Sequence, residues 1–405
     1  MPVSVTQALD IIYKNSSVVS SELLPIEMAL GRVMSEDSIA TFDLPRFDNS
    51  AMDGYAVKCS DANSTVTCTD VIYAGDDPQM TLQTSQAIKI MTGAPIPNGC
   101  EAVIPIENVT VNDTQITLPQ EIKKDGHIRH AGEDIKRGAV YLHKGEKVTA
   151  YSIALLASQG VTHLRVTRKI KVAVFGTGDE LRPHFEKISQ HQLYNSNTPM
   201  FLARAKELGC EVQYIGSSGD TMESLTSAIK SALNADIIIT SGGISMGDKD
   251  FTKEAFTNLG MELHFDKVDI KPGKPTAFGT IGETVVINLP GNPLASMVNY
   301  EIFVRAAIRK MSGMNAYYHH TISTHIREDF TLREGKHTVR LGTFDGNTFM
   351  PFTKQLPGMI SPLEQANAML ITIPDVAILE KGKSVKILPI NWELTASEKE
   401  DFFTR

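Results

Sequence analysis

The feature of this chain that most constrains its fold is a regular alternation of short apolar strands with helical segments between residues 169 and 310. Strands alternating with helices of about 10–15 residues are typical of an α/β domain with a largely parallel sheet. The predicted strands are Lys171–Phe175, Glu211–Ile215, Asp236–Thr240 and Val285–Leu289, and the predicted helices are Ser196–Leu208, Met222–Leu233 and Leu294–Met311. Glycine-rich turns follow three of these strands. Because ligands bind beyond the carboxyl ends of such strands, the turns predict a binding site there.

The segments before and after this α/β region are predicted to form mainly β-strands. Short β-prone pieces separated by Gly and Pro clusters predict hairpins. Before the α/β region the predicted strands are Thr65–Tyr73, Ala87–Met91, Ala102–Glu107 and Gln115–Leu118. After it, strands are predicted within the segments Ala316–Leu332, Lys336–Phe344, Ala368–Ile373 and Lys383–Ile390. Shorter helices are predicted at the N-terminus, where Ser4 and Gln7 have capping-box spacing, and at Ile26–Leu30 and Tyr151–Gln159.

The expected fold class is therefore α/β multidomain, with a parallel-rich α/β domain and additional β-domains. Five parts are predicted: an N-terminal helical and linker region at 1–44 together with 145–168, an inserted β-rich domain at 45–144, the α/β domain at 169–315, a C-terminal β-domain at 316–395, and a tail at 396–405.

Charge and cysteine content exclude several classes of protein. The formal net charge is −8, which disfavours a nucleic-acid partner but leaves room for a small anionic ligand held by a local basic cluster. The four cysteines form no CxxC pair, so neither a disulfide framework nor a zinc site is expected. Asp10 interrupts the first apolar run, and no apolar stretch approaches 18 residues. We expect a cytoplasmic protein without a membrane segment.

The turns of the α/β region contain the strongest candidate site residues. Glu180 lies in TGDEL, after the first strand, and could ligate a metal or bond a nucleotide or pterin edge. The segment SGGISMGDKD, after the third strand, offers Ser241, Gly242, Gly243, Asp248 and Asp250. Exposed amides at such a turn suit phosphate, and the acids suit magnesium. The alternative is a βα turn without a ligand.

Two further motifs could supply groups for an oxyanion. KPGKP holds Lys271 and Lys274 on a stiff turn. LPGNPLAS leads into the last helix and places the Ser296 hydroxyl in its first turn. The alternatives are an exposed turn with incidental lysines and a simple helix cap.

The β-rich insertion contributes a third group of polar motifs. They provide Asp53 in FDNSAMDGYAV, Thr92 in MTGAPIP, and Arg129 and Asp134 in HIRHAGED. Asp53 could hold a hydrated cation or a substrate hydroxyl, and Arg129 suits phosphate or carboxylate. Asx turns, a plain loop and a solvated surface are the structural alternatives. All motifs together indicate phosphoryl or pyrophosphate chemistry on a small substrate.

The motifs resemble, in order and along nearly the whole chain, those of the MoeA family, the molybdopterin molybdenumtransferases related to the gephyrin E domain. The segments are FDNSAMDGYAV, MTGAPIPNGCEAV, GEDIKRG, TGDEL, SGGISMGDKD, KPGKPTAFG and LPGNP. The resemblance implies a MogA-like α/β domain at 169–315. It also implies insertion of molybdenum from molybdate into adenylylated molybdopterin, with release of AMP and help from Mg²⁺ or a similar cation. A homodimer with a shared active site and a MogA-like adenylyltransferase as partner are implied as well.

The resemblance also assigns residue roles. It implies catalytic roles for Asp53, Glu180, Asp220, Asp250, Lys271 and Lys274, and a metal set of Glu180, Asp220 and Asp250. It implies substrate binding by Thr92, Arg129, Asp134, Ser241, Gly242, Gly243 and Asp248, and molybdate binding by Lys274, Ser296, Arg340 and Ser361. The turn before Ser361 reads KQLPGMI, where many members have a Gly/Ser-rich turn. Tungstate would suit the same donors. The alternative activities are a MogA-like adenylyltransferase and a gephyrin-like scaffold.

Overall fold

A computed structural model of the chain describes all residues except 220, 243–250, 333–334, 336 and 392–405. The contacts divide the chain into two compact units. The first unit comprises Met1–Leu23, Gly31–Ser35 and Arg165–Arg405, and the second comprises Leu24–Leu30 and Glu36–Leu164.

The first unit is built on a six-stranded sheet in the order β16-β13-β17-β20-β19-β18. The four strands from β16 to β20 are parallel, as predicted, whereas β19 and β18 pair antiparallel at one side. The strands are β13 (Lys171–Thr177), β16 (Glu211–Ser218), β17 (Ile237–Ser241), β18 (Glu262–Phe265), β19 (Ala277–Ile281) and β20 (Thr284–Leu289). The short strands β14 (Leu181–Arg182) and β15 (Leu193–Tyr194) form a separate parallel pair.

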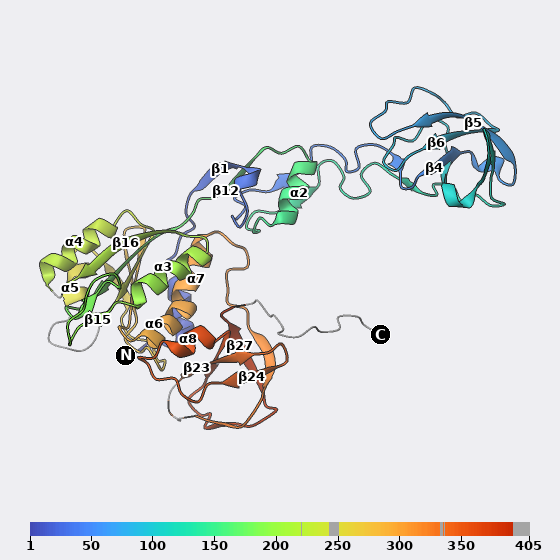
Figure 1. Ribbon diagram of the computed structural model, residues 1–405. Helices are drawn as coiled ribbons and strands as arrows, with labels where there is room; N and C mark the ends of the chain where they lie inside the picture. Colours follow the sequence, from blue (N-terminus) through green and yellow to red (C-terminus); the bar gives the residue numbers. More distant parts are fainter. Residues whose placement is uncertain (220, 243–250, 333–334, 336, 392–405) are drawn as a thin grey trace. The chain divides into compact units, whose positions relative to one another are not determined.

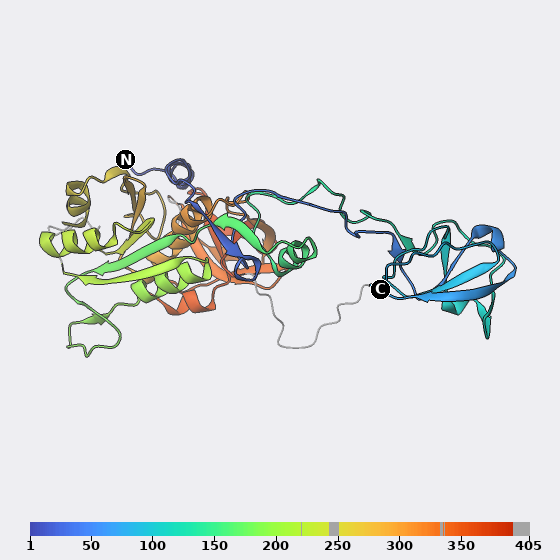
Figure 2. The ribbon, with the colours of Figure 1, turned by 90° about the horizontal axis from the view of Figure 1, so that it is seen from above.

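Helices cover both faces of this sheet (Figures 1 and 2). One apolar core lies under α4 (Met222–Ala232) and α5 (Phe251–Asn258), where Phe175 stacks on Phe256. The other core lies under α1 (Val5–Lys14), α3 (Asn197–Glu207), α6 (Pro293–Asn299) and α7 (Arg305–Met311). Ser4 caps α1 with Gln7 in the predicted capping box.

The last helix of the α/β region contains a feature that the sequence did not predict. The expected helix Leu294–Met311 is continuous as a helical stretch, but residues Tyr300–Val304 between α6 and α7 form a π-helix, η4. Its Glu301 is buried and pairs with Arg204 and Arg305. Segments of π-helix within α-helices are frequent at functional sites.

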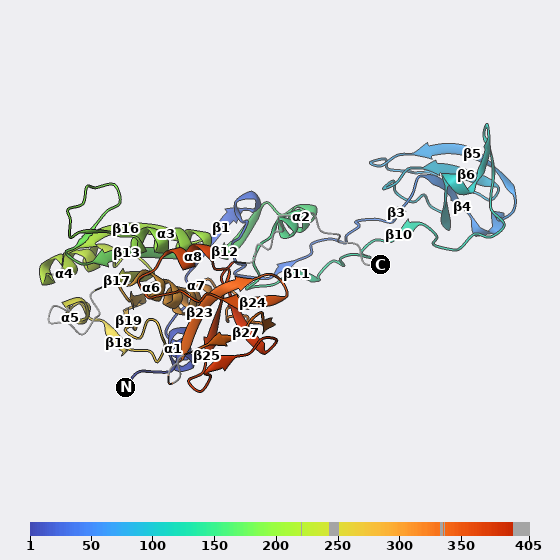
Figure 3. The same cartoon turned by 60° about the horizontal axis from the view of Figure 1, so that its bottom comes forward.

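The C-terminal part of the first unit is a small closed barrel with the order β21-β24-β23-β25-β27 (Figure 3). Leu341 and Met369 of the barrel belong to the same apolar core as Phe201 and Val298 of the α/β region. The barrel strands are β21 (Ile322–Ile326), β23 (Thr338–Phe344), β24 (Thr348–Pro351), β25 (Ala368–Thr372) and β27 (Ser384–Pro389). Additional elements here are the pair β22 (Phe330–Thr331) and β26 (Ile378–Leu379), and the short helix α8 (Ser361–Gln365).

The second unit contains a six-stranded mixed sheet in the order β7-β4-β6-β5-β9-β8. Its strands are β4 (Gly54–Val57), β5 (Thr65–Ile72), β6 (Gln86–Ile90), β7 (Ala102–Pro105), β8 (Thr110–Asn112) and β9 (Gln115–Thr117). Smaller pairs are β2 (Ser38–Ile39) with β11 (Val140–Leu142) and β3 (Asn49–Ser50) with β10 (Ile128–Arg129). Helix α2 is Ala150–Ser158. The strands β1 (Ser21–Pro25) and β12 (His163–Thr167) pair with each other, and the unit boundaries fall within both of them. The predicted helix Ile26–Leu30 is a single 3₁₀ turn, η1 (Ile26–Met28); short 3₁₀ turns also occur at η2 (Cys59–Asp61) and η3 (Ile106–Asn108).

Candidate functional site

A cavity of about 690 Å³ lies where β13, β17 and β20 end, and we call it the strand-end cavity. The predicted glycine-rich turns form much of its wall, together with the β14–β15 pair and the start of α6. It is lined by Thr177, Gly178, Glu180, Leu181, Leu193, Tyr194, Asn195, Ser196, Asn197, Gly242, Pro275, Pro290, Gly291, Asn292, Pro293, Gly358 and Ile360. The carboxyl end of the parallel strands is therefore hollowed at the place where the glycine-rich turns predict a binding site.

Close backbone approach explains the glycines of this wall. A Cβ on Gly242 would lie 2.6 Å from the Thr177 carbonyl oxygen, and its φ of +94° is rarely adopted by other residues. A Cβ on Gly176 would lie 2.7 Å from Nδ2 of Asn195. A larger residue at position 242 would need the backbone at Thr177 to move, so Gly242 allows the first and third turns to lie together, whereas Gly176 leaves room for the Asn195 side chain.

A buried asparagine that the sequence did not single out joins the turns. Nδ2 of Asn197 donates hydrogen bonds of 2.7 Å both to Oγ of Ser241 and to the Gly291 carbonyl oxygen. Oγ of Ser241 in turn donates to the Pro290 carbonyl oxygen at 3.3 Å. Asn197 thus fixes the ends of β17 and β20 relative to α3. The polar run Tyr194–Asn197 before that helix was the available signal.

Glu180 and Gly242 are the predicted site residues that line the strand-end cavity. Ser241 lies just behind its wall and is buried. Four further predicted residues, Asp220, Gly243, Asp248 and Asp250, lie outside the described part of the chain. Within the described part, no three His, Cys, Asp or Glu side chains gather closely enough to hold a metal ion.

The lysine turn, Lys271–Pro275, borders the same cavity through Pro275. The side chains of Lys271 and Lys274 are exposed. The carbonyl oxygen of Gly273, between them, accepts hydrogen bonds from Oγ1 of Thr276 at 2.9 Å and from Nδ2 of buried Asn299 at 3.3 Å. The bond from Asn299 holds the turn against α6, and the bond from Thr276 closes the turn on itself.

The lysine turn also bonds to barrel strand β23. The Lys271 N–H donates to the His337 carbonyl oxygen, and the Val339 N–H donates to the Lys271 carbonyl oxygen, both at 2.8 Å. Lys271 is thereby the bridge partner of Thr338, two residues before Arg340. The structure therefore connects the backbone of the lysine turn with the strand that contains the predicted arginine.

The other predicted oxyanion residues differ in environment. Ser296 is fully buried, and its hydroxyl donates to the Pro293 carbonyl oxygen at 2.9 Å, so its single proton is already in use. The Arg340 guanidinium lies over the Phe330 ring, 5.4 Å from its centroid. Ser361 is exposed at the start of α8. The turn before it contributes Gly358 and Ile360 to the cavity wall.

Four predicted residues lie in the second unit. The backbone N–H and Oγ1 of Thr92 both donate to Oδ1 of Asp53, each at 2.7 Å. These two hydrogen bonds hold the pKa of exposed Asp53 below its usual value. Arg129 lies on β10, and the Asp134 N–H donates to the Leu44 carbonyl oxygen at 3.0 Å. Both side chains are exposed.

These features define a multidomain α/β protein with a cavity at the carboxyl ends of its parallel strands, the place where such folds bind ligands. Residues 3–160 match the MoeA N-terminal region (domain I and II), and residues 173–310 match a probable molybdopterin binding domain. No helix among the described residues is long and apolar enough to cross a membrane.

Relatives of known name agree with these matches. A molybdopterin molybdenumtransferase of Staphylococcus epidermidis is 34% identical over 402 residues, which cover 96% of this chain and 95% of the relative. One of Haemophilus influenzae is 39% identical, covering 73% of this chain and 74% of the relative. The crystal structure of the molybdopterin biosynthesis MoeA protein of Pyrococcus horikoshii OT3 has a TM-score of 0.85 at 26% identity, covering 96% of this chain and all of that one. The chain belongs to the MoeA family of molybdopterin molybdenumtransferases.

Proposed function

We propose that the protein acts in molybdenum cofactor biosynthesis, inserting molybdenum from molybdate into adenylylated molybdopterin with release of AMP. The observation that carries this proposal is the strand-end cavity, where a carboxylate, glycine-rich turns and the lysine turn border one space of about 690 Å³. In the reaction one water cleaves the pyrophosphate link and AMP leaves, while the two dithiolene thiols of the substrate bind molybdenum and one oxo group of molybdate departs as water with their two protons. The substrate supplies these sulfurs, so no protein thiol is required.

The strand-end cavity would take the nucleotide and its phosphates. Backbone amides at strand ends suit phosphate oxygens. Nucleotide contacts are assigned to Ser241, Gly242, Gly243 and Asp248. The cross-link from Asn197 to Ser241 and Gly291 supports this role, because it fixes the turns before a ligand arrives.

Glu180, Asp220 and Asp250 are proposed to hold Mg²⁺ or a similar cation. Of this set, Glu180 lines the cavity in the described part of the chain, and carboxylate oxygen is the ligand that Mg²⁺ prefers. When bound, the cation would offset phosphate charge and polarise the P–O bond that is cleaved.

Molybdate is assigned to Lys274, Ser296, Arg340 and Ser361, with Lys271 beside it. A tetrahedral dianion suits such charge-assisted donors. The two hydrogen bonds between the lysine turn and β23 support the assignment, since they connect Lys271 with the strand of Arg340. Because the Ser296 hydroxyl donates to Pro293, it would have to rotate before donating to an oxyanion.

The second unit is proposed to contribute Asp53, Thr92, Arg129 and Asp134 to the active site of a partner subunit in a homodimer. We also propose that the protein is cytoplasmic and receives its substrate from a MogA-like adenylyltransferase. The division into parts at 1–44 with 145–168, 45–144, 169–315 and 316–395, with a tail at 396–405, is likewise proposed.

The test is AMP release from adenylylated molybdopterin with Mg²⁺ and either molybdate or tungstate. The Lys274→Ala variant should lose oxyanion-dependent release. Lys206→Ala is the matched control, because Lys206 is exposed on α3 and does not line the strand-end cavity. If the wild type releases no AMP with either oxyanion, or if Lys274→Ala equals Lys206→Ala, the proposal is wrong.

A further inference from the structure

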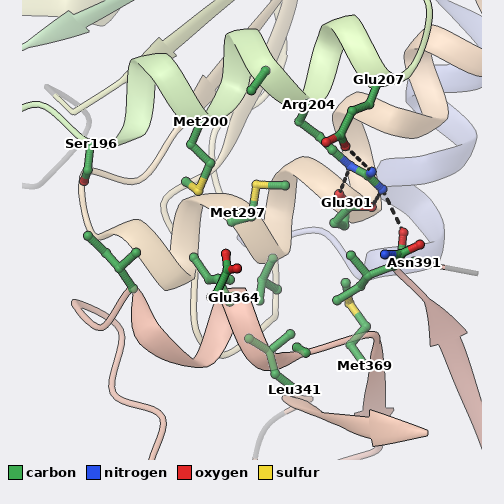
Figure 4. Close-up of a pocket in the computed structure, with 16 residues that line it drawn as sticks. Ser196, Met200, Arg204, Glu207, Met297, Glu301, Leu341, Glu364, Met369 and Asn391 are labelled. Atoms are coloured by element: carbon green, nitrogen blue, oxygen red, sulfur yellow. Dashed lines mark hydrogen bonds and ion pairs between the residues drawn. The ribbon is translucent and has the colours of Figure 1, made fainter. Parts of the chain in front are cut away.

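A second cavity, of about 750 Å³, lies between α3, α6, α8 and the barrel, and we call it the helix–barrel cavity (Figure 4). Ser196 and Ile360 line both cavities, so the two are neighbours. The helix–barrel cavity is lined by Ser196, Met200, Ala203, Arg204, Glu207, Met297, Val298, Glu301, Leu341, Ile360, Leu363, Glu364, Ala366, Met369, Ile390 and Asn391.

The one arginine of this lining already has its partners. Nε of Arg204 donates to Glu301 at 2.6 Å, Nη1 donates to Glu207 at 2.7 Å, and Nη2 donates to the Ile390 carbonyl oxygen at 2.9 Å. With this arginine and three glutamates, the lining has a formal charge of −2. The cavity therefore disfavours phosphate and molybdate, and suits a neutral or cationic group that carries hydrogen-bond donors.

Glu364 on α8, an exposed side chain at the cavity wall, is the carboxylate available to such a ligand. Figure 4 shows its carboxylate directed into the cavity, beneath Met297. Among the described residues, Glu364 has no hydrogen-bond or ion-pair partner, in contrast to Glu207 and Glu301. Its two carboxylate oxygens can accept a pair of parallel hydrogen bonds from a planar group with two adjacent donors.

The walls around this carboxylate suit a flat ring. The thioethers of Met200 and Met297 line the cavity, and methionine sulfur makes favourable contacts with aromatic rings. Leu363 adds to this apolar wall, and the buried side chains of Met369 and Val298 pack behind it. The lining thus offers apolar contact for ring faces and a carboxylate for one ring edge.

We propose that the helix–barrel cavity binds the pterin end of the substrate, with Glu364 accepting hydrogen bonds from the 2-amino group and N3–H of the pterin. This inference rests on the proposed function and divides its substrate between the two cavities. A pterin presents two adjacent donors on this edge, which match a carboxylate. Adenine presents a donor next to an acceptor and matches it poorly. The nucleotide end accordingly belongs in the strand-end cavity.

The discriminating experiment uses two fluorescent probes, pterin (2-amino-4-oxopteridine) and lumazine (2,4-dioxopteridine). Lumazine replaces the 2-amino donor by an acceptor. Wild-type protein should bind pterin about tenfold or more tightly than lumazine, because an unmatched polar edge beside a charged group is costly. Glu364→Gln should reverse the preference, since a carboxamide pairs with the acceptor and donor of lumazine. A purely structural role for Glu364 would not reverse it.

Two further variants complete the design. Glu380→Gln is the matched control, an exposed glutamate of the barrel region that lines neither cavity, and it should retain the wild-type preference. Ala203→Trp, on an exposed position of α3, should fill the helix–barrel cavity, weaken pterin binding at least tenfold and leave AMP binding unchanged.

Equal binding of the two probes by the wild type, or an unchanged preference in Glu364→Gln, would overturn the assignment. Loss of AMP binding with intact pterin binding in Ala203→Trp would also overturn it. Oxyanion-dependent AMP release by the wild type tests the proposed function separately, so the proposed function and the pterin assignment can fail independently.

Discussion

Replacing Asn299 by leucine should loosen the lysine turn without unfolding the protein. Asn299 is fully buried on α6, and its Nδ2 donates to the Gly273 carbonyl oxygen at 3.3 Å and to the Ala295 carbonyl oxygen at 2.8 Å. Gly273 has a φ of +106°, and a Cβ there would lie 1.7 Å from Nδ2 of Asn299. The turn and the asparagine therefore fit together closely.

The magnitude follows from these contacts. Two hydrogen bonds are lost, each contributing about 0.5–1.5 kcal/mol, so the free energy of unfolding should fall by about 1–3 kcal/mol. The turn keeps its internal bond from Thr276 to the Gly273 carbonyl oxygen and the two backbone bonds of Lys271, so it would stay attached to the barrel. Because displacement of a binding group by about 1 Å can cost up to 100-fold, we expect the KM for molybdate to rise about tenfold.

The assay is AMP release as a function of molybdate concentration, together with thermal and denaturant unfolding. Asn367→Leu is the matched control, because Asn367 bridges the N–H and carbonyl oxygen of Phe344 at 2.7 Å each, in the barrel. It should lose similar stability with an unchanged KM for molybdate. If the two variants lose equal stability and neither alters this KM, Asn299 does not position the lysine turn.

Three further outcomes are expected. Gly242→Ala should reduce AMP binding at least tenfold in equilibrium titrations, because its Cβ would lie 2.6 Å from the Thr177 carbonyl oxygen; an unchanged affinity would refute this. Burial lowers the pKa of His319 from 6.5 to about 4, so wild-type stability should fall by about 3 kcal/mol as the pH drops from 6.5 to 4. His319→Gln should remove this part of the pH dependence of unfolding, and a slope equal to that of the wild type would contradict the argument. Thr92→Val removes one of two hydrogen bonds to Asp53 and should raise the pKa of Asp53 toward its usual value in an NMR titration; no change would show that the backbone bond alone sets it.

Local patterns were sufficient to predict the parallel core. β13, β17 and β20 are buried on both faces, and such strands read as continuous apolar runs whose ends are marked by glycines. The antiparallel strands β18 and β19 were not predicted, since their partly exposed positions break the apolar run. The barrel strand β24 (Thr348–Pro351) was not predicted either; its buried positions are limited to Phe349 and Pro351.

The candidate site was only partly predictable, because local sequence patterns show its turns but not the distant contacts that hold them. Glycine-rich turns after strands are visible in a sequence, whereas Asn197 and Asn299 act through partners about 94 and 26 residues away along the chain. The π-helix at Tyr300–Val304 could not be predicted from the sequence either, because the helical pattern of apolar residues continues through it. Its Glu301 meets Arg204 from a separate helix. The contacts of Asn197, Asn299 and Glu301 thus join residues that are far apart in the sequence, and local sequence patterns do not predict such contacts.

The buried charges of the helix–barrel cavity give the barrel a role beyond covering the α/β core. Arg204 and Arg305 both pair with Glu301, and they donate to the carbonyl oxygens of Ile390 and Pro389 at the end of β27. A buried ion pair that loses one partner leaves an uncompensated charge, so this arrangement strongly favours one position of the barrel end. Glu364 and the lysine turn are attached to the same barrel, through α8 and β23. The ion pairs that hold the barrel therefore also set where the proposed pterin and oxyanion groups meet the strand-end cavity.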